Sequence, residues 1–393
     1  MNTPKIRFKG FTDDWEQRKL GEVVGIYDGV HQTPQYQDSG IMFLSVENIT
    51  TLKSEKYISE EAFERDYKVY PEKGDILMTR IGDVGTTNVV QTKEKVAFYV
   101  SLALLKPKEI NSYFLSNAMK TSVFQKGLRE RTLVTAIPQK INKDEIGRVN
   151  VFITNNAEEQ KKIGDYFTAL DHLITLHQRK CDETKQLKKF MLQKMFPKNG
   201  EKNPKIRFEG FTDDWEQRKL GDVFKEYSEK HHEELPALTI VQGGGTIFRE
   251  ESDRSLQYDK SNLSGYKMVK KDDFIVHLRS FEGGLEKANS DGIISPAYHT
   301  MHGDNVDSRF YYPYFRSYDF INRKLVAHVY GIRDGRSIDI DGMKSIEIPY
   351  TSYEEQKTIG DYLDSLDHLI TLHQRKCEKL KELKKYMLHN MFV

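Results

Sequence analysis

Apolar side chains recur in alternating steps of three and four residues along two long stretches of this chain. The stretches cover residues 158–196 and 354–393, and neither contains proline. Such a heptad seam, sustained over about four heptads, predicts two long helices that form a coiled coil. Lys188 and Lys384 interrupt the seam at equivalent places. The seam positions include Leu170, Ile174, His177 and Cys181 in the first stretch, and Leu366, Ile370, His373 and Cys377 in the second.

Shorter apolar runs outside these stretches predict strands, and glycine-containing breaks separate them, as at Gly82 and Gly85. Residues 111–128 have the apolar spacing of a helix. The fold class we predict is therefore α+β, with two mixed α/β domains separated by an antiparallel two-helix coiled coil. The predicted strands are residues 41–46, 75–78, 149–153, 237–241, 274–276 and 345–349.

The sequence repeats itself. Residues 4–21 return at 204–221 with one difference in 18 positions, and residues 158–196 return at 354–392 with 28 of 39 positions identical. The stretches between the repeats, 22–157 and 222–353, have little in common. We interpret this as a shared scaffold that carries two different heads. The boundaries we predict are a first domain 1–157 (repeat segment 1–21), a helix 158–196, a linker 197–203, a second domain 204–353 (repeat segment 204–221) and a helix 354–393.

The repeat also predicts a geometry. If the two seams pack on each other, the helices run antiparallel, and a pseudo-two-fold axis relates the copies. A helix of 39 residues is about 58 Å long at ~1.5 Å per residue. One turn of B-DNA spans about 34–36 Å. A rigid spacer of that length, carrying two different heads, suits a split and asymmetric target.

Composition excludes several classes of protein. The 393 residues suit two or three domains. Lys plus Arg is 60 and Asp plus Glu is 59, which argues against a highly basic protein that coats nucleic acid without specificity. Two cysteines exclude a disulfide-rich scaffold and a four-cysteine zinc site. The absence of a long apolar run and of a signal peptide predicts a cytoplasmic protein without a membrane segment.

No motif for catalysis emerges, and we predict no catalytic residue and no metal site. The sequence lacks a Gly-x-Ser-x-Gly motif and a phosphate loop. The run Gly243–Gly245 favours a turn over a nucleotide cradle, and residues 231–234 favour a solvated loop over a metal cluster. His177 and Cys181, spaced four apart on the seam, could bind a metal, but a polar layer that fixes the register is the favoured interpretation.

Local charge is more informative than total charge. Residues 120–148 hold seven Lys or Arg against three acids, interleaved with amides and hydroxyls, a mixture suited to phosphates and base edges. Residues 222–353 hold 17 basic and 21 acidic residues, so the second head alone should bind DNA weakly. The DNA-contact residues we predict are Thr79, Arg80, Arg129, Arg131, Gln139 and Lys140 in the first head, and Arg279, Ser280, Arg333 and Arg336 in the second.

Two motifs occur in duplicate and in the same order: Trp15–Gly21 with its copy 215–221, and Glu158–Gln160 with Glu354–Gln356. Through them the chain resembles, over essentially its whole length, the specificity subunit of a type I restriction–modification system. Gly74–Leu77 with Arg80, and Gly292–Tyr298, also resemble family text, whereas Asp272 departs from it by standing where the first head has Gly74.

The resemblance implies that two target-recognition domains each read one half of a bipartite double-stranded DNA site. It implies that the helices dock two modification subunits, which bind S-adenosylmethionine and methylate adenine, and that restriction subunits using ATP and Mg join them. The chain itself would bind no cofactor. Two other hypotheses stay open: a coiled-coil adaptor without DNA, and a self-contained methyltransferase or nuclease with an unrecognised site.

Overall fold

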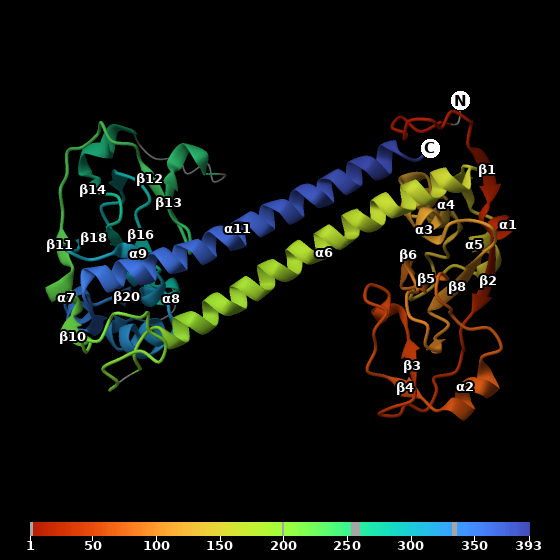
Figure 1. The fold of residues 1–393 in the computed structure, drawn as a ribbon. Helices are drawn as coiled ribbons and strands as arrows, with labels where there is room; N and C mark the ends of the chain where they lie inside the picture. Colours follow the sequence, from red (N-terminus) through yellow and green to blue (C-terminus); the bar gives the residue numbers. More distant parts are fainter. Residues whose placement is uncertain (1–2, 199, 253–259, 332–335) are drawn as a thin grey trace. The chain divides into compact units, whose positions relative to one another are not determined.

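The computed structural model of the chain describes residues 3–198, 200–252, 260–331 and 336–393. It divides into two compact units: residues 1–178 with 374–393, and residues 179–373. Each unit contains one head together with part of both long helices, α6 (Ala157–Lys194) and α11 (Tyr353–Asn390) (Figure 1). The two units are described separately.

The first unit is built on a four-stranded sheet in the order β2-β8-β5-β6. Its strands are antiparallel, and Ile76–Met78 of β5 and Leu102–Leu105 of β8 are fully buried. Beside it, β1 pairs with β9, so the repeat segment at the N-terminus is joined to the end of the head. The elements are β1 (Glu16–Lys19), α1 (Leu20–Val23), β2 (Val24–Asp28), β5 (Ile76–Ile81), β6 (Asp83–Val89), β8 (Leu102–Pro107), α3 (Ser112–Ala118), α4 (Ser122–Arg131), α5 (Lys143–Gly147) and β9 (Asn150–Ile153).

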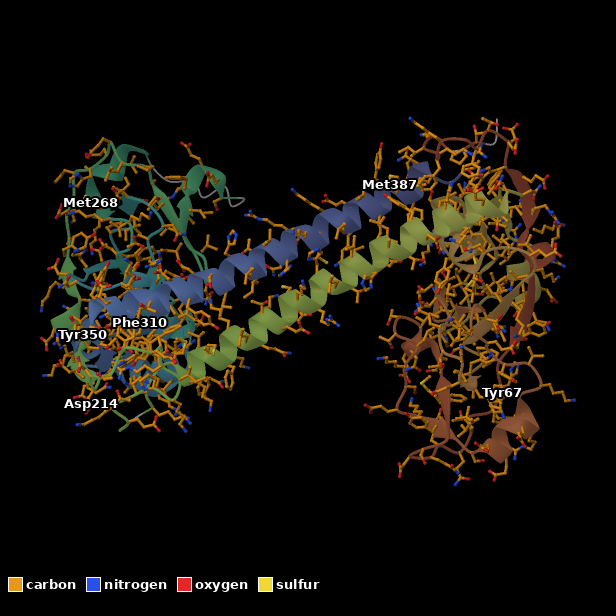
Figure 2. All side chains as sticks on the ribbon, in the orientation of Figure 1. Tyr67, Asp214, Met268, Phe310, Tyr350 and Met387 are labelled. Carbon is orange, nitrogen blue, oxygen red and sulfur yellow. The ribbon has the colours of Figure 1, made fainter. Side chains whose placement is uncertain are left out.

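A second, smaller sheet in this unit has the order β4-β3-β7 and its own apolar core. Tyr67 lies in that core (Figure 2), where its hydroxyl donates a hydrogen bond of 2.8 Å to the Phe98 carbonyl. The β3–β7 pair is parallel. The elements are β3 (Ile41–Leu44), a 3₁₀ turn (Val46–Asn48), β4 (Tyr57–Ile58), α2 (Glu60–Asp66) and β7 (Val96–Phe98).

The second unit has the same arrangement of strands in its main sheet, built from a different amino-acid sequence. Its four-stranded sheet has the order β11-β18-β15-β16, and β10 pairs with β21 as β1 pairs with β9. Three two-stranded pairs, β12–β13, β14–β17 and β19–β20, accompany it. The elements are β10 (Glu216–Lys219), α7 (Leu220–Val223), β11 (Lys225–Tyr227), β12 (Leu238–Val241), β13 (Gly245–Phe248), β14 (Lys267–Val269), β15 (Phe274–Val276), α8 (Ser280–Gly283), β16 (Glu286–Lys287), β17 (Gly292–Ile294), β18 (His299–His302), α9 (Ser308–Phe315), β19 (Val329–Tyr330), β20 (Ser337–Ile338), α10 (Ile340–Lys344) and β21 (Glu347–Tyr350). Short 3₁₀ or π turns cover Arg249–Glu251, Lys260–Gly265, Phe320–Lys324 and Leu325–His328.

A buried ion pair joins each head to its long helix. In the first unit, Arg7 Nε and Nη2 donate to both carboxylate oxygens of Glu159, at 2.5 and 2.9 Å, and Glu159 is completely buried. Arg207 binds Glu355 in the same way at 2.7 and 2.8 Å. The duplicated Glu-Glu-Gln motif therefore has a structural role in both units.

The following glutamine fixes a second junction. Gln160 accepts a hydrogen bond from the Asn111 amide at the start of α3, and it donates to the Thr154 carbonyl. Gln356 makes the equivalent bonds with the Asp307 amide and the Thr351 carbonyl. A bidentate ion pair and an amide bridge, both largely shielded from water, hold each helix start to its head more firmly than exposed pairs would.

In each unit an aromatic cluster of the head packs against the C-terminal end of a long helix: α11 in the first unit and α6 in the second. Phe392, just after α11, packs on Trp15 and Phe114 with ring centroids 5.8 and 5.5 Å apart. In the second unit Phe196 packs on Trp215 and Phe310 at 6.2 and 4.9 Å, and Figure 2 marks Phe310 at this place. The repeated Met-Phe pair at each helix end thus completes a head core.

The prediction of a single helix over residues 111–128 was wrong. The structure has two helices, α3 and α4, separated at residues 119–121. Thr121 causes the break, because its hydroxyl donates to the Ala118 carbonyl at 2.8 Å and accepts from the Phe124 amide as the cap of α4. A threonine hydroxyl that satisfies the end of one helix and the start of the next favours a turn there.

Within each unit the two long helices pair in antiparallel fashion, as the seam predicts. In the first unit Cys377 Sγ donates to the Ile174 carbonyl at 3.9 Å. In the second, Cys181 Sγ donates to the Ile370 carbonyl at 3.9 Å. Leu170, Leu366 and both cysteines are buried, and the cysteines are not disulfide-bonded.

Candidate nucleic-acid interface

A short hairpin follows α4 in the first unit and carries several of the predicted contact residues. Its ends are paired, since the Leu133 amide donates to the Lys140 carbonyl at 2.8 Å and the reverse bond is 3.4 Å long. It is also tied to the β5–β6 turn, where the Gly82 amide donates to the Gln139 carbonyl and Gln139 Nε2 donates back to the Gly82 carbonyl, both at 2.9 Å. We call residues 133–140 the first hairpin.

Arg80 supports this hairpin from beneath. The prediction placed Arg80 against DNA, but its side chain is only 7% exposed. Its guanidinium donates to the Ile141 carbonyl at 3.1 Å and forms an ion pair with Asp28. Thr79 is also buried, and its hydroxyl accepts from the Thr86 amide inside the β5–β6 hairpin. Both residues therefore position the backbone that carries the hairpin rather than lining the surface.

Exposed positive charges lie just before the hairpin and at its last residue. Arg129 and Lys140 are exposed, and neither forms an ion pair with a residue that the structure describes. Arg131, at the end of α4, is half-buried and donates to the Gly127 carbonyl at 3.0 Å. The structure thus brings Thr79, Arg80, Gln139 and Lys140 together, with Arg129 and Arg131 leading into the same segment.

The second unit places its predicted contact residues around one carboxylate. Arg279 donates to Glu282 at 2.8 Å, and Arg336 donates to the other oxygen of Glu282 at 3.1 Å. The Arg336 guanidinium also lies over the Phe281 ring, 4.4 Å from its centroid. Ser280 is buried and accepts from the His277 amide, so it too has a supporting position. Arg333 lies outside the described residues.

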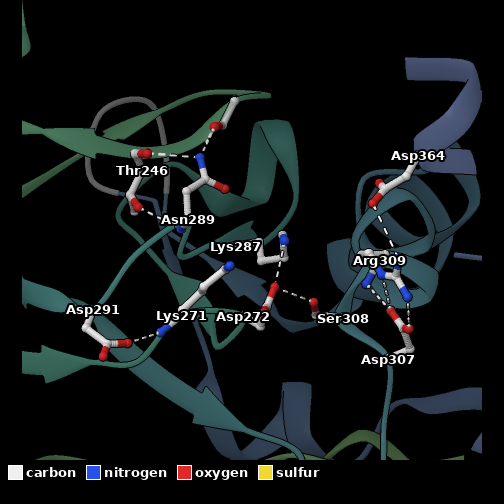
Figure 3. A network of polar contacts seen from close by, with 11 residues as sticks. Thr246, Lys271, Asp272, Lys287, Asn289, Asp291, Asp307, Ser308, Arg309 and Asp364 are labelled. Atoms are coloured by element: carbon white, nitrogen blue, oxygen red, sulfur yellow. Dashed lines mark hydrogen bonds and ion pairs between the residues drawn. The ribbon is translucent and has the colours of Figure 1, made fainter. Parts of the chain in front are cut away.

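Asp272 adopts the backbone conformation for which the first head uses glycine. The φ angles are +73° at Asp272 and +97° at Gly74. The carboxylate of Asp272 accepts from Lys287 at 2.8 Å and from the Ser308 hydroxyl at 2.9 Å (Figure 3). Partial burial acts to raise the pKa of this carboxyl, but the hydrogen bond from Lys287 leaves it below its ordinary value. Asp272, which replaces the glycine of the first head, therefore has a structural role: it connects the sheet to α9.

The glycine run of the second head forms a turn, as predicted. The amides of Gly243 and Gly245 donate to the two oxygens of Glu286 at 2.7 and 3.0 Å. Arg316 and the Tyr312 hydroxyl bind the same carboxylate, which is completely buried. These donors have the geometry of an anion site, but the chain's own carboxylate occupies it. The run is thus a fixed turn that anchors β12–β13 to β16.

The long helices carry charge in their seam at the two interrupting lysines. Lys188 pairs with Asp367 at 2.5 Å in the second unit, and Lys384 pairs with Asp171 at 2.5 Å in the first. Each seam cation therefore has a partner on the opposite helix.

An exposed apolar stripe accompanies the seam in both units. Leu173 of α6 and Leu383 and Tyr386 of α11 are exposed in the first unit. The equivalent residues are also exposed in the second unit. They are Leu187 and Phe190 of α6 and Leu369 of α11, and Leu372 of α11 is exposed beside them. The register of the Asp171–Lys384 pair sets Leu173 within about one helical turn of Leu383. In heptad terms these are g and c positions, which neighbour each other on one flank of a helix. We call these residues the helix stripe.

Among the described residues, no group of three or more His, Cys, Asp and Glu side chains is arranged to hold a metal ion. No helix in the described part of the chain is long and apolar enough to cross a membrane.

Comparison with known proteins identifies the family. The profile of the type I restriction modification DNA specificity domain matches the chain twice, at residues 12–186 and 212–382. The chain belongs to the type I restriction–modification specificity family. The two matches cover both repeats, so this specificity subunit carries the family domain in duplicate, and the family is one of DNA recognition rather than catalysis.

Named relatives agree with this assignment. The chain is 24% identical over 413 residues to the MjaX type I restriction enzyme specificity subunit of Methanocaldococcus jannaschii, covering 99% of this chain and 95% of that protein. It is 23% identical over 400 residues to the MjaVIII specificity subunit of the same organism, covering 96% and 92%. The crystal structure of the S subunit from M. genitalium shares its fold, with a TM-score of 0.63, 14% identity and coverage of 100% and 99%.

Several structurally important residues escaped the sequence argument. Arg7 and Glu159 were not singled out as partners, although both recur in the second copy as Arg207 and Glu355. An opposite-charge pair retained in both copies of a repeat was the signal that could have revealed them. Glu286 and Glu282 gave no comparable signal, because the two heads differ at those places.

Proposed function

We propose that this chain selects a bipartite sequence in double-stranded DNA, and that each head reads one half of it. The observation that carries the proposal is the four-stranded sheet, built twice in the same strand order from unrelated text. A shared framework with divergent surface segments gives two readers with different specificities. The printed names of the M. jannaschii relatives, which are specificity subunits, support the same role.

Affinity for the DNA backbone comes partly from other subunits in this proposal. Phosphate contacts supply most of the binding free energy of DNA-binding proteins. The second head has 17 basic residues against 21 acidic ones, and two of its exposed arginines are paired with Glu282. A partner that clamps the duplex would supply the missing positive charge.

We further propose that the helix stripe docks two modification subunits. The same group of exposed apolar residues occurs once in each unit, and a repeated surface suits two copies of one partner. Exposed leucine and aromatic side chains that gather on one helical flank are typical of protein interfaces. The partners would bind S-adenosylmethionine and methylate adenine, and restriction subunits would supply ATP- and Mg-dependent cleavage.

A head exchange tests the central proposal. Residues 22–157 are replaced by the corresponding head of another specificity subunit, and the methylated sequence is determined in cells that also hold the modification subunits. We expect one half of the methylated site to change and the other to remain. The reciprocal exchange of residues 222–353 is the matched control and should change only the other half. A change of both halves, or of neither, contradicts the proposal.

A further inference from the structure

The first hairpin exposes more apolar surface than its size would lead one to expect. Ile137 is 100% exposed, Val134 is 69% exposed and Leu133 is 46% exposed. Single exposed apolar residues are ordinary, but three within the first five residues of one hairpin form a concentrated apolar surface. A surface of this kind is typical of a binding site.

The hairpin is held firmly although its tip is uncovered. Backbone bonds join Leu133 to Lys140 and Gly82 to Gln139. At its base the Ile141 amide donates to the Arg80 carbonyl, and the Ile141 side chain is completely buried in the main core. A tip fixed to the sheet at several points loses little conformational entropy when it binds, which favours recognition.

The surroundings indicate a polyanion as the occupant. No acidic residue occurs from Arg131 to Lys143. Arg129 and Lys140 flank the apolar tip, and both are exposed. The nearest acidic residue along α4 is Glu130. Its carboxylate lies 4.0 Å from the Lys126 amine, so it offsets the charge of Lys126, which is farther along the chain from the hairpin than Arg129. Apolar side chains flanked along the chain by cations match duplex DNA, which presents base edges and thymine methyl groups between two rows of phosphates.

The second unit builds a comparable feature at the same place in its fold. There β19 and β20 form a hairpin directly before α10, as the first hairpin precedes α5. Tyr330 in β19 is 60% exposed, and Arg336, which pairs with Glu282, directly precedes β20. The two segments have different amino-acid sequences. An exposed apolar side chain near a cation therefore recurs at the same position in the fold without sequence similarity.

We propose that the first hairpin enters the major groove of duplex DNA and that Ile137 and Val134 contact base edges there, while Arg129 and Lys140 bind the adjacent phosphates. The major groove, about 12 Å wide, admits a compact protein element such as this segment, which the Leu133–Lys140 bridge closes. Apolar side chains there distinguish thymine by its methyl group. The inference rests on the proposed function and adds to it the residues that discriminate bases. Arg80 and Thr79 act in it as positioning residues beneath the hairpin.

The test uses the full complex of this chain with its modification subunits and measures binding across a library of DNA targets. With Ile137→Ser combined with Val134→Ser, we expect preference to relax by about tenfold or more at one or two base pairs of a single half-site. The salt dependence of binding should stay unchanged, because no phosphate contact is lost. Arg129→Gln should instead weaken binding to all sequences equally and reduce the salt slope by about one.

Two controls separate the alternatives. Leu173→Ser on the helix stripe should weaken subunit assembly and leave base preference unaltered. Unchanged preference at every position in the hairpin variant overturns the inference, and so does loss of copurification with the modification subunits, since the hairpin would then be a protein-docking element. If the wild-type complex itself shows no sequence preference, the proposed function fails with it. An intact wild-type preference beside an unaltered variant refutes the hairpin role alone.

Discussion

At the scale of single residues, the most consequential contacts lie in the repeated text and not in the heads. Glu159 is completely buried and has both oxygens bound by Arg7. Removing one member of a buried ion pair leaves an uncompensated charge, whereas an exposed pair contributes little. Arg7 and Glu159, and their copies Arg207 and Glu355, therefore matter because each forms a buried ion pair, which a count of charges does not reveal.

Glu159→Leu should lower the free energy of unfolding of the first unit by about 3–5 kcal/mol. The double variant Arg7→Met with Glu159→Leu should recover most of that loss, because no unpaired charge then stays buried. Urea denaturation followed by amide hydrogen exchange in the first unit measures both. Glu22→Leu, which breaks the exposed pair with Arg18, is the matched control and should leave stability nearly unchanged. Equal effects of the two single variants would contradict the prediction.

Sequence reasoning at this scale selected contact residues by type, and the structure shows that several of them do not lie at the surface. It selected Arg80, Thr79 and Ser280, which are buried, because residue type alone carries no information on which side of a strand or turn faces solvent. It passed over Ile137 and Val134, because apolar residues are normally assigned to a core. Their exposure depends on the hydrogen bonds that turn the hairpin outward, and those bonds join segments far apart in sequence.

At the scale of elements, periodicity predicted the two long helices and their antiparallel pairing. The seam interruptions at Lys188 and Lys384 proved to be cross-helix ion pairs with Asp367 and Asp171. The order of strands within each sheet could not be predicted, because pairing between distant strands depends on packing that single strands do not encode. The break between α3 and α4 was missed, since the apolar spacing continues through Thr121.

Lys120 lies in that break and provides a pH-dependent test. Burial, together with the nearby charge of Lys384, lowers the pKa of Lys120 to about 8, although Asp171 acts in the opposite sense. Between pH 8 and about 10.5, the ordinary value, the unfolded chain holds a proton that the folded chain has released. Stability should therefore rise with pH across this window, and the full penalty applies below pH 8.

Lys120→Met removes this titration. We expect the variant to be more stable than the wild type at pH 7, and the difference to diminish steadily towards pH 10. Thermal denaturation at pH 7, 8, 9 and 10 measures the change. Lys126→Met, at an exposed site on α4, should show a small difference with no such slope. A stability difference for Lys120→Met that is the same at every pH would show that the amine stays charged and solvated.

At the scale of the whole molecule, the near-zero net charge fits the role that we propose for the chain. The chain has 60 basic and 59 acidic residues, so it lacks the excess positive charge of a protein that coats DNA. A specificity subunit benefits from that balance, since weak nonspecific binding leaves base contacts to decide where the complex stops. The repeat was readable from sequence in full, because near-identical text occurs twice, whereas the heads required a structure.

The long helices make the spacing between the two half-sites testable. Both α6 and α11 contribute residues to each unit, so we expect their length to set the number of base pairs between the half-sites. One heptad inserted after Gln178 and one after His373 preserve the paired contacts within each unit and add about 10.5 Å. That length matches roughly three base pairs, but three base pairs also turn the second half-site by about 100° around the DNA axis.

Three heptads at each place add about 31 Å, close to the 34–36 Å of one helical turn, and keep both half-sites on the same side of the duplex. We therefore expect the three-heptad variant to methylate a site with a spacer about one turn longer and unchanged half-sites, and the one-heptad variant to methylate poorly. Methylation-site sequencing of cells that express each variant with the modification subunits gives the spacer directly. An unchanged spacer in a folded three-heptad variant would mean that the partner subunits, rather than these helices, set the distance.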